Sequence, residues 1–255
     1  MHKKWYSLYD KVYAKMNLRH SFAQVKRNAG AAGIDGQSIS DFGKQLSKEL
    51  DRLHEELAGK RYVPQAVRRV YISKPDGSQR PLGIPTVRDR VVQQALLNVL
   101  QPIFEPDFHP SSYGYRPGRS CAHAVAKAER FMNHYGLSQV VDMDLSKCFD
   151  TLSHDQILDG VNQKVSDGSI LELIKKMLRS GVVEQGRYQE PTIGCPQGGV
   201  ISPLLMNIYL DRFDQHMRSL GIRIVRYADD ILILASTKSE AGKYRWIAQR
   251  YLEST

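Results

Sequence analysis

The sequence has few cysteines and no long hydrophobic run. Only three cysteines occur among 255 residues, widely spaced and odd in number, so neither a disulfide framework nor a zinc cage is expected. No apolar stretch reaches the ~18 residues of a membrane-spanning helix. The opening residues, MHKKWYSLYDKVYAK, lack the apolar core of a signal peptide. These absences predict a cytoplasmic protein, kept in a reducing compartment, with no membrane partner.

A nucleotide-binding P-loop is lacking as well. The glycine-rich segment GCPQGGVISPLL at 194–205 does not end in Gly-Lys-Ser or Gly-Lys-Thr, which disfavours a Walker-type ATPase. Its glycines allow the backbone to approach a ligand closely. A tight loop before a helix predicted at 206–217 explains the same residues.

Positive charge is present and unevenly distributed. Lys and Arg number 36 against 27 Asp and Glu, a net charge of +9. Residues 1–90 hold 18 Lys and Arg against 9 Asp and Glu, so the whole surplus lies in the first third. A basic region joined to a neutral one suggests a polyanionic partner such as nucleic acid. A solubilising surface explains the charge equally well.

Helix and strand patterns are mixed along the chain. The leucine spacing predicts a helix over 41–57 that starts at a Ser40 cap and ends at Gly59. Two β-prone stretches within 67–85 flank Lys74–Gly77, a hairpin turn signal. Strands are predicted at 139–145 and 222–235, the latter with a continuously apolar centre at 231–234 typical of a central, covered strand.

Two capping boxes add helix starts to this pattern. Thr86 with Asp89 predicts a helix through 91–100, and Ser153 with Gln156 predicts one after the first acidic strand. No regular βαβ alternation appears. The pattern therefore favours an α+β layer fold over a doubly wound sheet.

Acidic residues gather where two predicted strands carry them. Asp229 and Asp230 lie in the YADD segment between apolar strand residues, and Asp142 and Asp144 share one face of the strand at 139–145. Adjacent carboxylates resist burial, and Asp-Asp is a poor two-residue turn compared with Asn-Gly. A solvent-exposed hairpin tip would tolerate the pair, but a divalent metal explains the clustering better.

Carboxylate oxygens at modest number suit Mg²⁺, which keeps waters and takes substrate phosphates as further ligands. Two such ions roughly 4 Å apart can clamp the attacking and leaving oxygens of a phosphoryl displacement. With the basic first third, the pattern indicates phosphoryl transfer on nucleic acid. The residues alone leave polymerase and nuclease both open.

The ordered segments RPLGIP, SSYGYRPGRS, VVDMDLSKCFDTLSH, GCPQGGVISPLL and VRYADD together resemble reverse transcriptases. The family most similar is the group II intron-encoded reverse transcriptase/maturase, whose N-terminal extension resembles LYDKVYAKMNLRHSFAQVKRNAGAAGIDGQSISDF. The resemblance covers essentially all 255 residues. Retron enzymes and CRISPR-linked relatives share YADD, but typically lack this form of PQGG and the extension, and remain minority alternatives.

The resemblance implies an α+β right-hand polymerase, with fingers and palm and a central antiparallel sheet flanked by helices. Residues 1–90 would form the N-terminal extension and fingers, and 91–255 the palm with an interleaved fingers segment at about 155–195. The family's thumb/maturase and endonuclease regions would be absent from this chain.

Roles follow residue by residue from the same resemblance. The catalytic aspartates would be Asp144, Asp229 and Asp230, which hold two Mg²⁺ ions, with Mn²⁺ as a substitute, and Leu145 would lend a metal its backbone carbonyl. Asp144 is favoured over Asp142 because an aromatic follows five residues later. The incoming nucleotide would be contacted by four residues: Lys74, Arg80, Phe149 and Gln197. Phe149 would lie under the sugar and exclude a 2′-hydroxyl.

Four arginines are expected to contact RNA or template, each with a plainer alternative. Arg68 and Arg69 belong to the basic stretch 60–69, which is otherwise a solvated strand edge. Arg116 and Arg119 lie in SYGYRPGRS, which is otherwise a charged loop.

The implied function is RNA-directed DNA polymerase, a nucleotidyltransferase linked to intron mobility and splicing. Its partners would be an RNA template, a DNA primer, dNTP and a group II intron RNA. The oligomeric state stays open, a homodimer included. The alternative is an intron-RNA-binding maturase fragment without polymerase activity of its own; a metal nuclease explains the carboxylates but not Lys74, Arg80 and Phe149 as a set.

Overall fold

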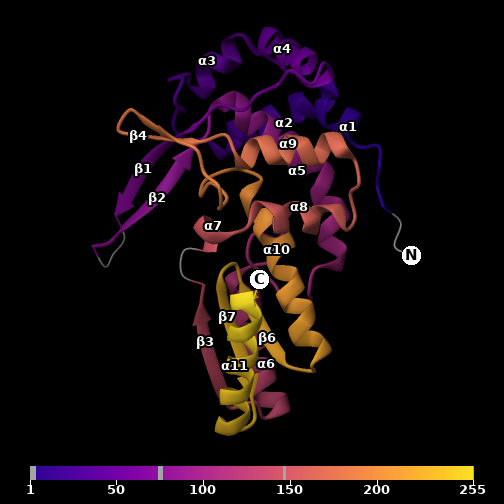
Figure 1. The fold of residues 1–255 in the computed structure, drawn as a ribbon, viewed down its shortest axis with the longest axis vertical. Helices are drawn as coiled ribbons and strands as arrows, with labels where there is room; N and C mark the ends of the chain where they lie inside the picture. The colour runs from indigo at the N-terminus through magenta and orange to yellow at the C-terminus, as the bar shows by residue number, and fades with distance from the viewer. Residues whose placement is uncertain (1–3, 74–76, 146–147, 255) are drawn as a thin grey trace. The chain divides into compact units, whose positions relative to one another are not determined.

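The computed structural model describes residues 4–73, 77–145 and 148–254. The chain forms two compact units. The first comprises Met1–Phe104 and Phe149–Leu205, and the second Glu105–Cys148 and Met206–Thr255. Each unit has its own sheet and its own helices, which are labelled in Figure 1.

Helices make up most of the first unit. Seven of them lie wholly within it: α1 (Tyr9–Tyr13), α2 (Lys15–Asn28), α3 (Ile39–Lys44), α4 (Leu46–Ala58), α5 (Val87–Phe104), α8 (His154–Asn162) and α9 (Gly168–Leu178). A short helix, α7 (Cys148–Thr151), begins at its boundary. The unit extends to Phe104, past the division expected at residue 90, because α5 packs against α2 and α1.

The prediction of a helix over 41–57 was wrong about the residue at which the helix begins. The Ser38 side chain, not Ser40, caps the first turn by accepting the Asp41 N–H at 3.1 Å, which satisfies one of the unpaired donors of a helix start. The chain then breaks at Gln45, and α4 carries the predicted leucine face into the core and ends at Gly59. Gly43 lies just before the break, where a flexible residue favours an interruption.

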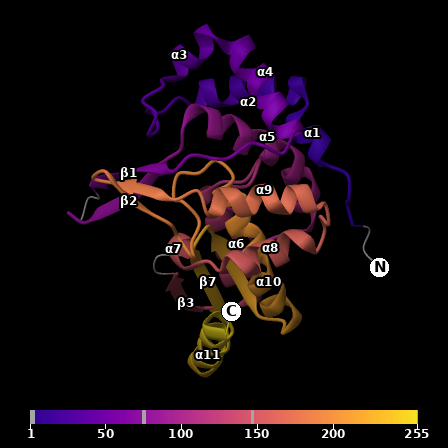
Figure 2. The ribbon, with the colours of Figure 1, turned by 45° about the horizontal axis from the view of Figure 1, so that its top comes forward.

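The first unit contains a four-stranded sheet in the order β2-β1-β4-β5. Its strands are β1 (Val67–Ser73), β2 (Gln79–Ile84), β4 (Val182–Glu184) and β5 (Arg187–Gln189). The predicted hairpin is confirmed by the antiparallel pairing of β1 with β2, whose connecting residues 74–76 lie outside the described ranges. Strand β4 joins β1 in parallel, and Figure 2 shows these strands side by side.

Both predicted capping boxes are confirmed. Thr86 accepts the Asp89 N–H at 3.1 Å at the start of α5, and Ser153 accepts the Gln156 N–H at 3.4 Å at the start of α8. Asp89 is buried and also accepts the Tyr62 hydroxyl and the Gln65 N–H. Asp89 also accepts the Thr86 hydroxyl, so one carboxylate in the first turn of α5 joins this helix to the distant segment at Tyr62 and Gln65.

The second unit is built on a three-stranded antiparallel sheet in the order β3-β7-β6. Its elements are β3 (Gln139–Asp144), β6 (Arg223–Tyr227), β7 (Asp230–Ala235), α6 (Cys121–Tyr135), α11 (Lys238–Ser254), the short 3₁₀ helix Glu105–Asp107 and α10 (Ser202–Ser219), which begins in the first unit. The sheet, α6 and α11 are visible in Figure 1.

The strand predicted over 222–235 was wrong in being continuous, since a turn divides it into β6 and β7, but β7 is central, as its apolar run predicted. Ile231 and Ile233 join a core with residues of α10 and α11, while Leu232 and Leu234 face the core formed by α6. A strand covered on both faces needs apolar residues at every position. The α+β class with a helix-flanked antiparallel sheet is thus confirmed. No helix in the described ranges is long and apolar enough to cross a bilayer.

Candidate active site

The two acidic strands pair with each other in the second unit. In the register of β3 with β7, Asp144 lies directly opposite Asp230, whereas Asp142 lies opposite Leu232. Directly opposed residues point to the same face of a sheet, with Cβ atoms about 5 Å apart. The register therefore brings Asp144, rather than Asp142, beside the YADD carboxylates.

The YADD segment forms the turn of the β6–β7 hairpin. Tyr227 pairs with Asp230, so Ala228 and Asp229 make the connection, and Ala228 adopts a left-handed φ of +59°. The Asp229 carbonyl accepts the Leu145 N–H at 3.4 Å. The two-residue turn is thus Ala228-Asp229 and not Asp229-Asp230, which begins β7 with its second residue, and the tip of this hairpin faces the acidic end of β3.

Repulsion among these carboxylates is evident at Asp230. Loss of hydration raises the pKa of Asp230, and the charges of Asp229, Asp144 and Asp142 raise it further. Hard oxygen donors that repel one another suit a divalent cation. Among the described residues, however, no three His, Cys, Asp or Glu side chains form a ready-made metal cluster. The donor set fits an ion that takes its remaining ligands from water and substrate phosphate.

The carbonyl expected to assist a metal belongs to Leu145. That oxygen accepts the Cys148 N–H at 3.0 Å. A carbonyl oxygen has two lone pairs, so one remains available for a cation.

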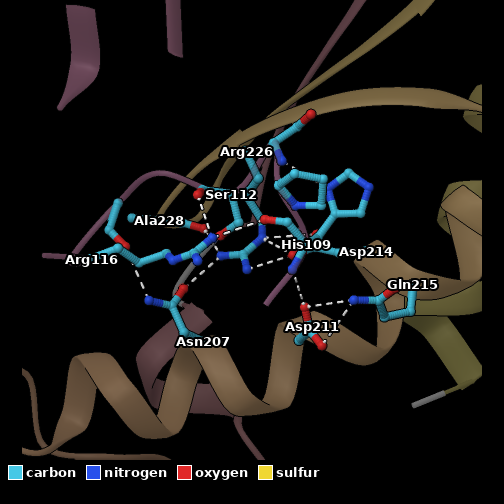
Figure 3. Close-up of polar contacts among 12 residues, drawn as sticks. His109, Ser112, Arg116, Asn207, Asp211, Asp214, Gln215, Arg226 and Ala228 are labelled. Carbon is cyan, nitrogen blue, oxygen red and sulfur yellow. Dashed lines mark hydrogen bonds and ion pairs between the residues drawn. The ribbon is translucent and has the colours of Figure 1, made fainter. Parts of the chain in front are cut away.

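Beneath the YADD turn lies a buried polar network that the sequence analysis missed. Arg226 and Asp214 are both fully buried and paired at 2.6 Å, as Figure 3 shows. The Arg226 guanidinium also donates to Asn207 Oδ1 and to the Ala228 carbonyl, each at 2.9 Å. Arg226 therefore anchors the turn that carries Asp229. The sequence signal that could have revealed this network is an arginine among the apolar residues of a predicted strand.

The SYGYRP motif packs against this same turn. A Cβ on Gly114 would lie 2.2 Å from the Ala228 nitrogen, so only glycine fits there. Asn207 donates to the Gly114 carbonyl at 3.0 Å. Two motifs far apart in sequence thus form one structure around Asn207.

Arg116, expected at the template, has its guanidinium occupied by partners within the unit. Its side chain is buried and donates to the carbonyls of His109 and Ser112 at 2.9 and 2.8 Å, and to Glu105. These partners use the guanidinium inside the unit, so Arg116 stabilises the loop. Arg119 donates to the Pro110 and Ser112 carbonyls but stays partly exposed.

In the first unit, the PQGG loop contacts the RPLGIP motif. The Gly83 N–H donates to the Gln197 carbonyl at 2.6 Å. A Cβ on Gly198, whose φ is +104°, would lie 2.5 Å from the Gly83 oxygen. The two motifs therefore approach as closely as backbones can.

Gln197 lines a surface hollow of about 260 Å³ in the same unit, with Arg69 and Asp150 among its walls. Arg69, expected at the template, thus lies beside a residue expected at the nucleotide. Cys195 also lines this hollow, and burial raises the pKa of its thiol to about 12. A thiol this weakly acidic is no nucleophile at neutral pH.

The remaining predicted residues are more scattered. Phe149 is buried, with its carbonyl accepting the Cys195 N–H at 2.6 Å. Arg80 is exposed on β2, and Arg68 donates to the Ala32 carbonyl at 2.7 Å. Lys74 lies outside the described residues.

Comparison with known proteins agrees with the motif pattern. The family described as "Reverse transcriptase (RNA-dependent DNA polymerase)" matches residues 72–255. The chain belongs to the reverse transcriptase family. The group II intron resemblance is confirmed too: the chain is 35% identical to the group II intron-encoded protein LtrA of Lactococcus lactis subsp. cremoris, across 81% of its own length and 34% of LtrA.

Protein YkfC of Escherichia coli (strain K12) is 36% identical across 90% of this chain and 70% of YkfC. A solved structure titled "Partial Cas6-RT-Cas1--Cas2 complex" matches 97% of this chain and 41% of its own, with a TM-score of 0.59 and 24% identity. This likeness supports the fold. The chain spans about a third of LtrA and less than half of the solved structure's chain.

Proposed function

We propose that the chain is an RNA-directed DNA polymerase of the group II intron type. The observation that carries the proposal is the register that sets Asp144 opposite Asp230, next to Asp229 in the hairpin turn. A nuclease would use similar carboxylates, but the family and the ordered motifs favour synthesis.

In the proposed reaction, the primer 3′-oxygen attacks the α-phosphorus of a dNTP, and pyrophosphate leaves. Asp144, Asp229 and Asp230 would hold two Mg²⁺ ions, or Mn²⁺ in their place, with the Leu145 carbonyl as a further ligand. Such ions, when bound, acidify the attacking hydroxyl and stabilise the leaving group. Arg226 would keep the turn in the conformation that presents Asp229.

The remaining roles are proposed from the resemblance. Lys74 and Arg80 would neutralise the triphosphate, since a point charge and a forked guanidinium suit phosphate oxygens. Phe149 would exclude a 2′-hydroxyl, and Gln197 would line the nucleotide pocket. We assign the first unit to the fingers and the second to the palm.

The test is extension of a DNA primer on an RNA template with Mg²⁺, comparing the unmodified chain with Asp229→Asn. We expect extension by the unmodified chain and at least about a 10³-fold loss in the variant, since charge placement of this kind contributes several kcal/mol. Asp155→Asn, which changes an exposed carboxylate on α8, is the matched control and should extend normally. Equal extension by Asp229→Asn and the unmodified chain would refute the assignment.

An intron-RNA-binding protein without polymerase activity is the second candidate. The basic first third and the similarity to an intron-encoded protein favour it. Binding of a structured intron RNA, with no extension by either chain in the same assay, would support this candidate instead.

A further inference from the structure

A basic groove lies in the first unit, and apart from the basic stretch 60–69, neither the motifs nor the proposed chemistry gives its residues a role. It consists of two hollows of about 330 and 360 Å³ that share Glu172 and Lys176 as wall residues. Because they share wall residues, the two hollows lie next to each other, and we refer to them together as the track. Two adjacent hollows suit successive units of an extended chain better than one compact small molecule.

The charge of this track is strongly one-sided. Its walls carry four cations, Lys60, Lys175, Lys176 and Arg179, against the single carboxylate of Glu172. Within the described ranges none of the four forms an ion pair. Cations left unneutralised along a groove attract a polyanion.

An aromatic platform stands at one end of the track. Tyr188 is 58% exposed, and its ring rests on the backbone of Gly181, where an added Cβ would lie 2.2 Å from a ring carbon. Because glycine supports one side of the ring, the rest can receive a flat partner. Unstacked bases bind such rings in a sequence-tolerant way.

We propose that this groove, lined by Lys60, Lys175, Lys176, Arg179 and Tyr188, binds single-stranded RNA. Phosphates would lie along the cations, and one base would stack on Tyr188. Glu172 repels phosphate but can accept a 2′-hydroxyl, which RNA has and DNA lacks. An acidic peptide would satisfy the cations and leave Tyr188 without a base to stack on. The proposal is independent of the polymerase assignment, since it concerns binding alone.

The test measures fluorescence anisotropy of labelled oligouridylate of about twelve nucleotides, within the site sizes of single-strand grooves. The full chain is used in EDTA without dNTP, so a failed polymerase assignment does not affect the readout. We expect Lys175→Ala with Arg179→Ala to raise Kd at least tenfold. The slope of log K against log salt should become shallower by about 0.7 for each phosphate that the variant no longer binds.

The stacking interaction has its own pair of variants. Tyr188→Leu should raise Kd at least fivefold, whereas Tyr188→Phe, which keeps the ring, should bind as the unmodified chain does. Lys243→Ala with Arg245→Ala removes one exposed lysine and one exposed arginine on α11 and is the matched charge control. Its Kd should stay within a factor of two.

Several results would overturn the proposal. One is an equal loss in the groove and α11 double variants, which would indicate only long-range attraction. Others are an unchanged Kd in Tyr188→Leu, equal binding of oligothymidylate DNA, or equally effective competition by polyglutamate. A Kd that rises in both groove variants, with the Tyr188→Phe and α11 variants unaffected, would support it.

Discussion

At the scale of single residues, the central finding is the buried Arg226 beneath the YADD turn. Its guanidinium makes bonds to Asp214, Asn207 and the Ala228 carbonyl. A buried charge is tolerated only when its partners are all in place. The turn that carries Asp229 is therefore held in place by a fully buried ion pair.

Removing the Arg226 charge should therefore be costly. We expect Arg226→Met to lower the free energy of unfolding by about 3–5 kcal/mol, because Asp214 would remain buried and unpaired. Urea denaturation measures the change. Arg223→Met, on the exposed side of the same strand, should change stability by less than about 0.5 kcal/mol. The double variant Arg226→Met with Asp214→Leu should recover much of the loss; no recovery would contradict the ion-pair explanation.

In the carboxylate cluster, by contrast, removing a charge should stabilise the chain. In EDTA we expect Asp230→Asn to stabilise the chain by up to about 1 kcal/mol, because it removes repulsion from Asp144 and Asp229 among largely hydrated groups. Mg²⁺ should raise the melting temperature of the unmodified chain more than that of the variant. A variant less stable than the unmodified chain in EDTA would argue against mutual repulsion.

At the scale of elements, local sequence signals determined where most helices and strands begin and end. Hydrogen bonds between distant segments determined which elements lie next to one another. Asp167 shows both effects, since it caps α9 by accepting the Ser169 N–H at 3.0 Å. It also accepts the N–H groups of Leu8 and Tyr9 at 2.8 and 3.0 Å, about 160 residues away in sequence. One carboxylate thereby joins the N-terminal segment to α9.

The stabilisation that the Asp167 hydrogen bonds provide should depend on pH. Burial raises the pKa of Asp167, but four backbone N–H donors outweigh it and hold the pKa below its usual value. Its stabilisation is therefore present above the unfolded-state pKa, about 3.9, and is lost as pH falls through the lower folded-state pKa. We expect Asp167→Ala to cost about 1–3 kcal/mol at pH 7.

Urea midpoints between pH 7 and pH 3 test this expectation. The gap between the unmodified chain and Asp167→Ala should narrow below about pH 4, where the carboxylate is protonated in the unfolded chain. Asp159→Ala is the control, since this carboxylate on α8 makes no such bonds to distant backbone within the part of the chain that the structure describes. A gap that stays constant with pH would contradict the role of the charge.

At the scale of the whole molecule, charge is the property that acts over the longest distance. The net charge of +9 arises from residues 1–90, all within the first unit. We expect RNA binding to weaken with salt, with log K falling by about 0.7 per log unit of salt for each single-strand phosphate contacted. Titrations at several salt concentrations measure this slope, and affinity that does not change with salt would exclude a phosphate-based interaction.

The sequence by itself determined the local elements and the family. The β1–β2 hairpin, both capping boxes and the central apolar strand β7 follow from spacing and from turn and cap residues, which act over a few positions. The pairing of two acidic strands was also foreseeable, because alternation and clustered charge are written in the sequence. The start of the helix at Ser38 was missed because several serines compete for one cap.

Only the tertiary structure decided what distant residues do together. It set Asp144 opposite Asp230, used Arg116 inside a loop instead of at the surface, and placed Arg226 under the YADD turn. The physical reason is burial. Whether a charged side chain meets water, substrate or a buried partner depends on packing between segments far apart in the chain, and spacing along the sequence does not encode that packing.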